Sequence, residues 1–208
     1  MAISTYAELK TAVASWLDRS DLTDIIPDFI VLAEARHRRD FKIRRMETRV
    51  TANTIADTEY YSLPDAYVAM RNIKLNSDPK TPLEYLTPEI MDRLQAGSKV
   101  GKPKAYSIKG NNIQIRPIPD GVYEIEISYY KHFTALSDSN TTNDMLTYHP
   151  DLYLYGALVE AEPYLKNDAR IATWAGFYDR AKKDVIDTNE RDRHSGTAPI
   201  TRIDYGAY

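Results

Sequence analysis

Residues 150–166, PDLYLYGALVEAEPYLK, decide the fold class that the sequence predicts, because they return the chain to helical periodicity after a long stretch without it. Pro150 suits the first turn of a helix, and Pro163 predicts a kink or an early end near the other terminus. The apolar residues on one stripe of this expected helix are Leu152, Tyr155, Leu158 and Val159.

A long final helix is expected next, capped by Asn167 or Asp168 and ending near Arg193. Its spacing places a run of apolar side chains on one face, which we expect to point into a core. These residues are Ile171, Trp174, Phe177, Tyr178, Ala181 and Val185.

Two further helices are expected near the N-terminus. Thr5 and Glu8 have the spacing of a capping box, and Pro27 suits the first turn of the second helix after a polar corner at 18–21. The apolar residues at helical spacing are Leu9, Val13, Trp16 and Leu17 in the first helix, and Phe29, Ile30, Ala33 and Phe41 in the second.

Between these helical regions, from about Met46, short stretches rich in β-branched and aromatic residues predict five to seven strands. In the last stretch, Ile125, Ile127 and Tyr129 alternate with polar residues. The triplet Gly110-Asn111-Asn112 is typical of a hairpin turn, and one short helix is expected after Thr87 as its N-cap. The strand-like stretches are METRVTA (46–52), TEYYSL (58–63), YVAMRNIKL (67–75), PKAYSIKG (103–110), NIQIRP (112–117) and VYEIEISYYKHF (122–133).

The order of helices, strands and helices predicts an α+β fold. We expect residues 1–45 and 146–193 to form a helical bundle and residues 46–136 to form an inserted, small antiparallel β-rich domain, either a sandwich or a barrel. A polar connector at 137–145 joins the two. Residues 194–208 lack helical periodicity, so they predict an extended C-terminal arm.

Composition limits the function classes. The chain of 208 residues has a net charge of −3, whereas dedicated nucleic-acid readers are usually basic. It contains no cysteine, which excludes disulfides and thiolate-based zinc sites. Neither a signal peptide nor an apolar run of membrane-spanning length is recognisable, so no membrane contact is expected.

No motif predicts catalysis, a cofactor or a metal. GSKVGKP, residues 97–103, lacks the spacing of a phosphate-binding loop and has Pro103 where a magnesium-binding hydroxyl would be needed. The four histidines show no metal-ligand spacing; His149, before Pro150, could cap a helix instead. The acidic corner around 18–28 lacks the glycine and closing glutamate of a calcium loop. We therefore expect a protein that is not an enzyme.

The segment RHRRDFKIRR, residues 36–45, concentrates six Arg and Lys residues around one acid. On a continuous helix, Arg38, Lys42 and Arg45 would form one stripe with Arg39 beside it. Three interpretations stay open: a solvated face paired with acids of the same chain, contact with an acidic protein partner, or weak contact with a nucleic-acid backbone. The second candidate function is thus a nucleic-acid-binding module that uses this basic segment.

Four stretches in this order resemble one protein family, the head-to-tail adaptor or connector proteins of tailed bacteriophages, particularly of short-tailed phages. The likeness extends from Tyr6 to about Arg193 and rests on packing patterns. The stretches are IPDFIVLAEARHRRDFKIRRME (26–47), PLEYLTPEIMDRL (82–94), EISYYKHFTALSDSNTTNDML (126–146) and YHPDLYLYGALVEAEPYLKNDARIATW (148–174).

The resemblance implies a homo-oligomeric ring of twelve copies beneath the phage portal protein at the head–tail junction of the virion, made in the host cytoplasm. The ring would extend the DNA channel, touch genomic DNA only non-specifically, and dock tail or nozzle proteins. It also implies that the segment from Thr201 to Tyr208 acts as an arm on a neighbour or on the portal. The expected interface residues are Arg38, Arg39, Lys42, Arg45, Ile200, Arg202, Ile203, Tyr205 and Tyr208.

Overall fold

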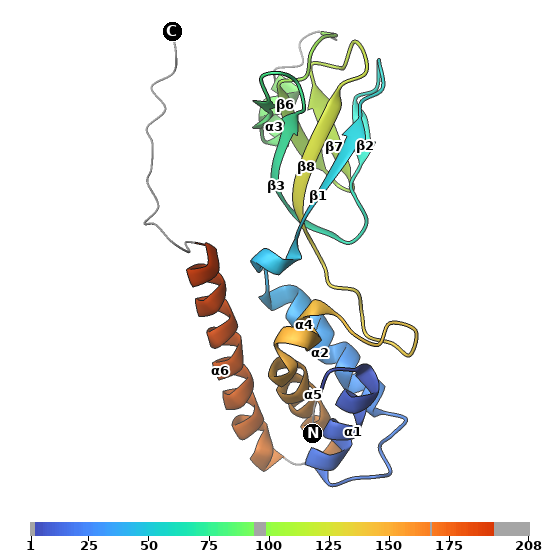
Figure 1. The fold of residues 1–208 in the computed structure, drawn as a ribbon, viewed down its shortest axis with the longest axis vertical. Helices are drawn as coiled ribbons and strands as arrows, with labels where there is room; N and C mark the ends of the chain where they lie inside the picture. Colours follow the sequence, from blue (N-terminus) through green and yellow to red (C-terminus); the bar gives the residue numbers. More distant parts are fainter. Residues whose placement is uncertain (1–2, 94–98, 167, 194–208) are drawn as a thin grey trace. The chain divides into compact units, whose positions relative to one another are not determined.

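The computed structural model describes residues 3–93, 99–166 and 168–193, so the expected arm at 194–208 lies outside the described residues. The chain contains helices and sheets, which confirms the predicted α+β class (Figure 1). Contacts divide it into a helical unit, Met1–Arg45 with Phe133–Tyr208, and a β unit, Met46–His132. No helix in the described part of the chain is long and apolar enough to cross a bilayer.

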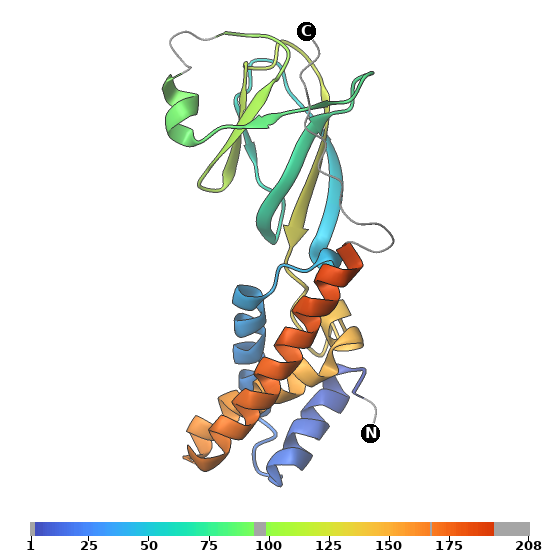
Figure 2. The ribbon, with the colours of Figure 1, turned by 90° about the vertical axis from the view of Figure 1, so that its left-hand side faces the viewer.

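The helical unit is built around α5 (Pro150–Leu165), which contacts four other helices: α1, α2, α4 and α6. Figures 1 and 2 both show α6, the red helix, running beside α5. The remaining elements are α1 (Tyr6–Leu17), α2 (Ile26–Asp40), the short 3₁₀ helix η1 (Arg44–Met46), α4 (Asp144–Tyr148) and α6 (Asp168–Arg193).

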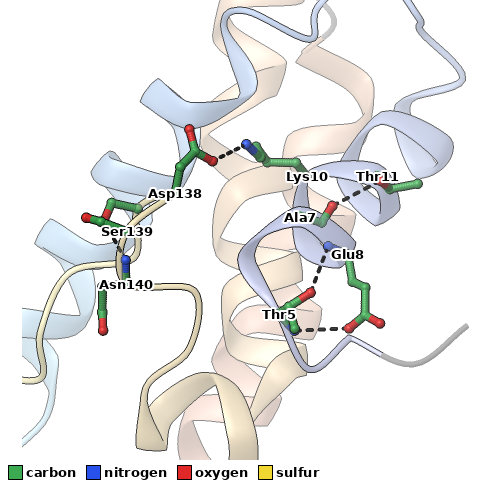
Figure 3. Close-up of polar contacts among 9 residues, drawn as sticks. Thr5, Ala7, Glu8, Lys10, Thr11, Asp138, Ser139 and Asn140 are labelled. Atoms are coloured by element: carbon green, nitrogen blue, oxygen red, sulfur yellow. Dashed lines mark hydrogen bonds and ion pairs between the residues drawn. The ribbon is translucent and has the colours of Figure 1, made fainter.

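The start of α1 has the predicted capping box, drawn in Figure 3. The backbone N–H of Glu8 donates to the Thr5 hydroxyl, while the Glu8 carboxylate accepts from the Thr5 backbone. One turn later, Lys10 forms a 2.9 Å ion pair with Asp138 in the segment that returns from the β unit. Helix α1 is therefore stabilised by its own N-terminal cap and by an ion pair with a residue distant in the sequence.

The closest helix contact in this unit lies between α2 and α5. Gly156 of α5 lies so near α2 that a Cβ added there would be 3.1 Å from the Cβ of Ala33. The same position faces the His37 imidazole and the Tyr178 ring, each 3.5 Å from that added atom. A methyl group at this position would therefore require Ala33 to shift by a few tenths of an ångström, in an interior that is closely packed.

Glu34, a buried carboxylate of α2, holds the returning segment against the helices. It accepts a 2.8 Å bond from the backbone N–H of Leu136 and a 3.1 Å bond from the Tyr153 hydroxyl. Tyr153 in turn accepts from the Asn143 amide at 2.8 Å, and that amide also donates to the Thr134 carbonyl. Burial raises the pKa of Glu34.

Three local predictions in this unit were wrong or incomplete. The expected connector at 137–145 overlaps α4, because the Asn143 side chain accepts from the backbone N–H of Leu146 and caps a helix there. His149 makes no side-chain cap bond at the start of α5. Pro163 lies inside the last turn of α5, which ends two residues later at Leu165 and is followed by a left-handed Lys166.

The β unit consists of two four-stranded sheets, in the orders β1-β8-β3-β4 and β2-β7-β6-β5. Pairing is antiparallel except between β5 and β6, which run parallel, so the expected purely antiparallel layout needs this correction. The elements are β1 (Glu47–Asn53), β2 (Tyr60–Ser62), β3 (Tyr67–Leu75), β4 (Thr81–Pro82), β5 (Glu84–Tyr85), α3 (Pro88–Arg93), β6 (Ala105–Lys109), β7 (Asn112–Arg116) and β8 (Glu124–Lys131).

Residues from both sheets form one core in this unit. The predicted alternation of β8 is confirmed, since Ile125, Ile127 and Tyr129 are buried in it. Gly110, with φ of 58°, forms the β6–β7 turn where hairpin chemistry was predicted. Eight strands occur among the described residues rather than five to seven, because β4 and β5 are two-residue strands without a sequence pattern.

The α2–α5 contact predicts opposite effects for two glycine-to-alanine changes. We expect Gly156→Ala to lower the free energy of unfolding by about 1–2 kcal/mol, because the new methyl group meets Ala33, whose Cβ cannot rotate away. Gly176→Ala in α6 meets no atom within 4 Å and should raise it by about 0.5–1 kcal/mol through helix propensity. Urea unfolding of both variants measures the difference; equal effects would contradict a close-packing role for Gly156.

Candidate assembly surfaces of the helical unit

The basic segment, residues 36–45, does not form the single helical stripe that was expected. Helix α2 ends at Asp40, and Phe41 continues in extended conformation. In this extended stretch Phe41 and Ile43 are buried and Lys42 between them is exposed. On a helix, Phe41 and Ile43 would point in nearly opposite directions, so burying both side chains ends the helix.

Three arginines of the segment are held by their own unit. Arg36 pairs with Glu160 and lies over the Tyr178 ring. The backbone N–H of Arg44 donates to the Asn189 side chain at 2.7 Å, and its guanidinium lies 3.7 Å from Asp192. The guanidinium of Arg45 lies 3.5 Å from the centre of the Tyr148 ring. These positive charges help to fasten elements together.

All cations of the segment except Arg36 are exposed, and Arg38, Arg39 and Lys42 are the ones outside the contacts just described. Arg38 is 4.0 Å from Glu34, and Arg39 and Lys42 form no ion pair with other described residues. The structure therefore places Arg38, Arg39 and Lys42 on the surface near the end of α2 and uses Arg45 separately in the ring contact. The other expected interface residues, Ile200, Arg202, Ile203, Tyr205 and Tyr208, lie outside the described residues.

A pocket of about 240 Å³ adjoins this segment within the helical unit. Its wall combines Arg44 and Arg45 with polar side chains of α6 and with a substantial apolar surface. Because Arg44 is paired with Asp192, the pocket offers less positive charge than its arginines suggest. The lining residues are Ile43, Arg44, Arg45, Tyr148, His149, Val185, Thr188, Asn189 and Asp192.

His37 is buried under the basic segment among aromatic rings. Its imidazole stacks on Tyr178 with an interplanar angle of 4° and meets the edge of Tyr153 at 4.9 Å between centroids. Burial lowers the pKa of His37 to about 4, and the nearby Arg36 acts in the same direction. The imidazole is therefore a neutral packing group at neutral pH.

An exposed aromatic surface cluster is formed by Trp16 of α1, Tyr155 of α5, and Trp174 and Phe177 of α6. Neighbouring ring centroids lie 5.4–6.0 Å apart. Trp16 and Phe177 are 44% and 42% exposed, so the expectation that the final helix turns Phe177 into a core was wrong. Such grouped aromatic rings are typical of protein interfaces.

The exposed groups of the helical unit are suited to contact with a partner. Within residues 3–93, 99–166 and 168–193, no group of three or more His, Asp or Glu side chains could hold a metal ion. The aromatic surface cluster offers apolar area from three helices, and the end of α2 offers cations. Spacing could locate these cations but not the cluster, since its rings come from three helices whose contacts depend on the tertiary fold.

The burial of His37 predicts a loss of stability in acid. Its ordinary pKa of 6.5 in the unfolded chain exceeds the folded value of about 4, so protons bind the unfolded chain first as the pH falls. Lowering the pH from 7 to 5 should remove about 2 kcal/mol through this residue, with the loss beginning near pH 6.5.

In His37→Leu this portion of the loss should disappear, which urea unfolding of both proteins at pH 7 and pH 5 measures. The raised pKa of Glu34 has the opposite sign, stabilising the fold as the pH falls, and it is present in both proteins, so it cancels in the comparison. If both proteins lost equal stability between the two pH values, His37 would not be the group that senses acid.

Comparison with known proteins identifies the family that the chain matches. The family model of the SU10 adaptor protein matches residues 4–202. No curated protein matches the chain. The matched region covers both units, including the aromatic surface cluster and the basic segment, and it confirms the resemblance to bacteriophage head-to-tail adaptors. The chain belongs to the SU10 adaptor protein family, a family of phage adaptors.

Proposed function

We propose that this protein is a structural head-to-tail adaptor of a phage virion, which forms a ring under the portal, extends the DNA channel and docks tail proteins. The family match over residues 4–202 carries this proposal. The function then depends on surface complementarity between folded subunits, and no bond of a substrate has to be made or broken.

Closed rings require two different surfaces on each subunit, because one face must fit the opposite face of the next copy. The aromatic surface cluster is the stronger candidate for a subunit contact. Its two tryptophans, tyrosine and phenylalanine present large rings whose positions are already fixed by ring contacts, so little side-chain freedom is lost on binding.

The cations at the end of α2 are proposed to contact an acidic surface of the portal or of a neighbouring subunit. Arg38, Arg39 and Lys42 are exposed and can reach a partner, whereas Arg45 would need to leave the Tyr148 ring. Together with these, the arm residues Ile200, Arg202, Ile203, Tyr205 and Tyr208 complete the proposed interface.

We further propose that the chain folds as a helical-bundle domain, residues 1–45 and 146–193, with residues 46–136 as the inserted domain. The contact-based units support this division in its main lines, although residues 133–136 group with the helical unit, where Leu136 is buried and donates to Glu34. Each domain would then supply its own contacts at the head–tail junction.

Assembly with the portal tests the proposal directly. Electron micrographs and light scattering of the protein mixed with portal should show rings on portal particles, while the protein alone can remain monomeric. Phe177→Ala should reduce ring formation at least about tenfold, since it removes an exposed aromatic side chain that contacts Tyr155 and Trp174 in the cluster.

Tyr60→Ala serves as the matched control, because it removes an aromatic side chain of similar exposure, 48%, from the β unit. Its ring yield should stay close to that of the unchanged protein. A protein that stays monomeric in the presence of portal would refute the adaptor assignment, and equal losses in both variants would refute the role of the cluster.

The second candidate function, nucleic-acid binding by the basic segment, makes a different prediction. Phosphate contacts would make the affinity for DNA fall steeply with salt, and Glu substitutions at Arg38, Lys42 and Arg45 would abolish it without affecting ring assembly. We expect at most weak DNA binding, because Arg36, Arg44 and Arg45 already have partners within the chain.

A further inference from the structure

Helix α2 has an exposed face that is acidic at one end, apolar in the middle and basic at the other. The residues of this face recur at positions i, i+4, i+7 and i+11, so they form one stripe along the 15-residue helix. Beside the stripe, Val31 is 56% exposed. The stripe, called here the α2 stripe, consists of Asp28, Leu32, Ala35 and Arg39.

No other segment of the described chain covers the exposed side chains of the α2 stripe. Leu32 is 49% exposed, although the opposite face of α2 is packed on α5. Asp28 and Arg39 are exposed and form no ion pair with any other described residue. An exposed Val–Leu pair between two charges without partners is unusual on a solvated helix, where apolar residues normally point to the core.

The spacing of the α2 stripe is that of a seam between two packed helices. If a second α2 lies antiparallel, with its centre opposite the same point between Leu32 and Ala35, then each Leu32 faces the other copy's small Ala35. In the same alignment each Asp28 faces the other copy's Arg39. The stripe is therefore complementary to itself in both size and charge.

A parallel alignment would be unfavourable, because it sets Asp28 against Asp28 and Arg39 against Arg39. The charge order thus selects the antiparallel alignment, which has twofold symmetry and uses the same surface on both copies. The helix dipole favours an acid near the N-terminus and a base near the C-terminus, so these charges also stabilise α2 itself.

We propose that the protein self-associates through the α2 stripe as an antiparallel twofold dimer. This goes beyond the adaptor role, since a twofold contact cannot by itself close a ring of many copies. The helix is about 22 Å long, so the interface is smaller than a standard one and the dimer is weak and reversible. The dimer covers Arg39 and would therefore compete with a partner that needs this cation.

Sedimentation equilibrium of the purified full chain, up to about 300 µM protein, tests the proposal at a concentration suited to a small interface. The unchanged protein should dimerise. Asp28→Arg and Arg39→Asp should each weaken dimerisation at least about tenfold, because each places two pairs of like charges across the seam.

Mixing the two single variants supplies the decisive result. In the heterodimer the introduced arginine of one chain faces the introduced aspartate of the other, and the unchanged Arg39 of the first faces the unchanged Asp28 of the second. Dimerisation should therefore return to within about threefold of the unchanged protein. In this mixture each variant α2 still carries a substituted charge that interacts unfavourably with its own helix dipole. A restored stability of the helix therefore cannot explain the recovered dimerisation. The double variant Asp28→Arg/Arg39→Asp should likewise dimerise.

Arg180→Asp on α6 is the control, since it makes the same charge change at an exposed residue away from the stripe and should leave dimerisation unaltered. Three outcomes would overturn the proposal: an unchanged protein that stays monomeric, single variants that dimerise normally, or a mixture of the variants that stays monomeric. Loss of dimerisation in Arg39→Asp but not in Asp28→Arg would instead indicate that Arg39 contacts an acidic surface other than Asp28 of the second copy. Ring formation with portal is measured separately, so failure here leaves the adaptor assignment standing.

Discussion

The close approach of α2 to α5 at Gly156 is the constraint on which the helical unit depends. A helix carrying any larger residue at this position would have to move away from Ala33, and His37 and Tyr178 would lose their packing with it. The contact also fixes the rotation of α2. With Ala33 and His37 turned inward, Asp28, Leu32 and Arg39 must face outward. The interior packing therefore determines which side chains are available to partners.

The same packing limits the positive charge that the dense basic segment offers to nucleic acid, in a chain whose net charge is −3. Burial of Phe41 and Ile43 ends α2 and separates the cations into two groups. Arg36, Arg44 and Arg45 hold Glu160, Asp192 and the Tyr148 ring, and so join distant parts of the chain. The other group, Arg38, Arg39 and Lys42, remains exposed to a partner. Its small size limits the charge available for long-range attraction to DNA.

Sequence patterns predicted those features that depend on local geometry. The capping box at Thr5, the turn at Gly110 and the alternation of β8 each follow from neighbouring residues, and all were confirmed. Periodicity could not show that Trp16 and Phe177 remain exposed, because an apolar stripe specifies a face of the helix but not whether other helices cover that face completely. The end of α2 was not predicted for a related reason. Tertiary packing buries Phe41 and Ile43, and this burial overrides the helix propensity of the segment.

In the two proposals, helix α2 and the aromatic surface cluster serve assemblies of different symmetry. The cluster draws its rings from α1, α5 and α6, so it is a separate surface from the α2 stripe. A ring needs two unlike surfaces per subunit, whereas a twofold dimer uses one surface twice. Because the dimer covers Arg39 while the cluster stays exposed, a portal that binds the cations of α2 would shift copies from the dimer to the ring by mass action. The weakness of a four-turn interface would then be an advantage, since a tightly bound dimer would withhold the subunits that the ring requires.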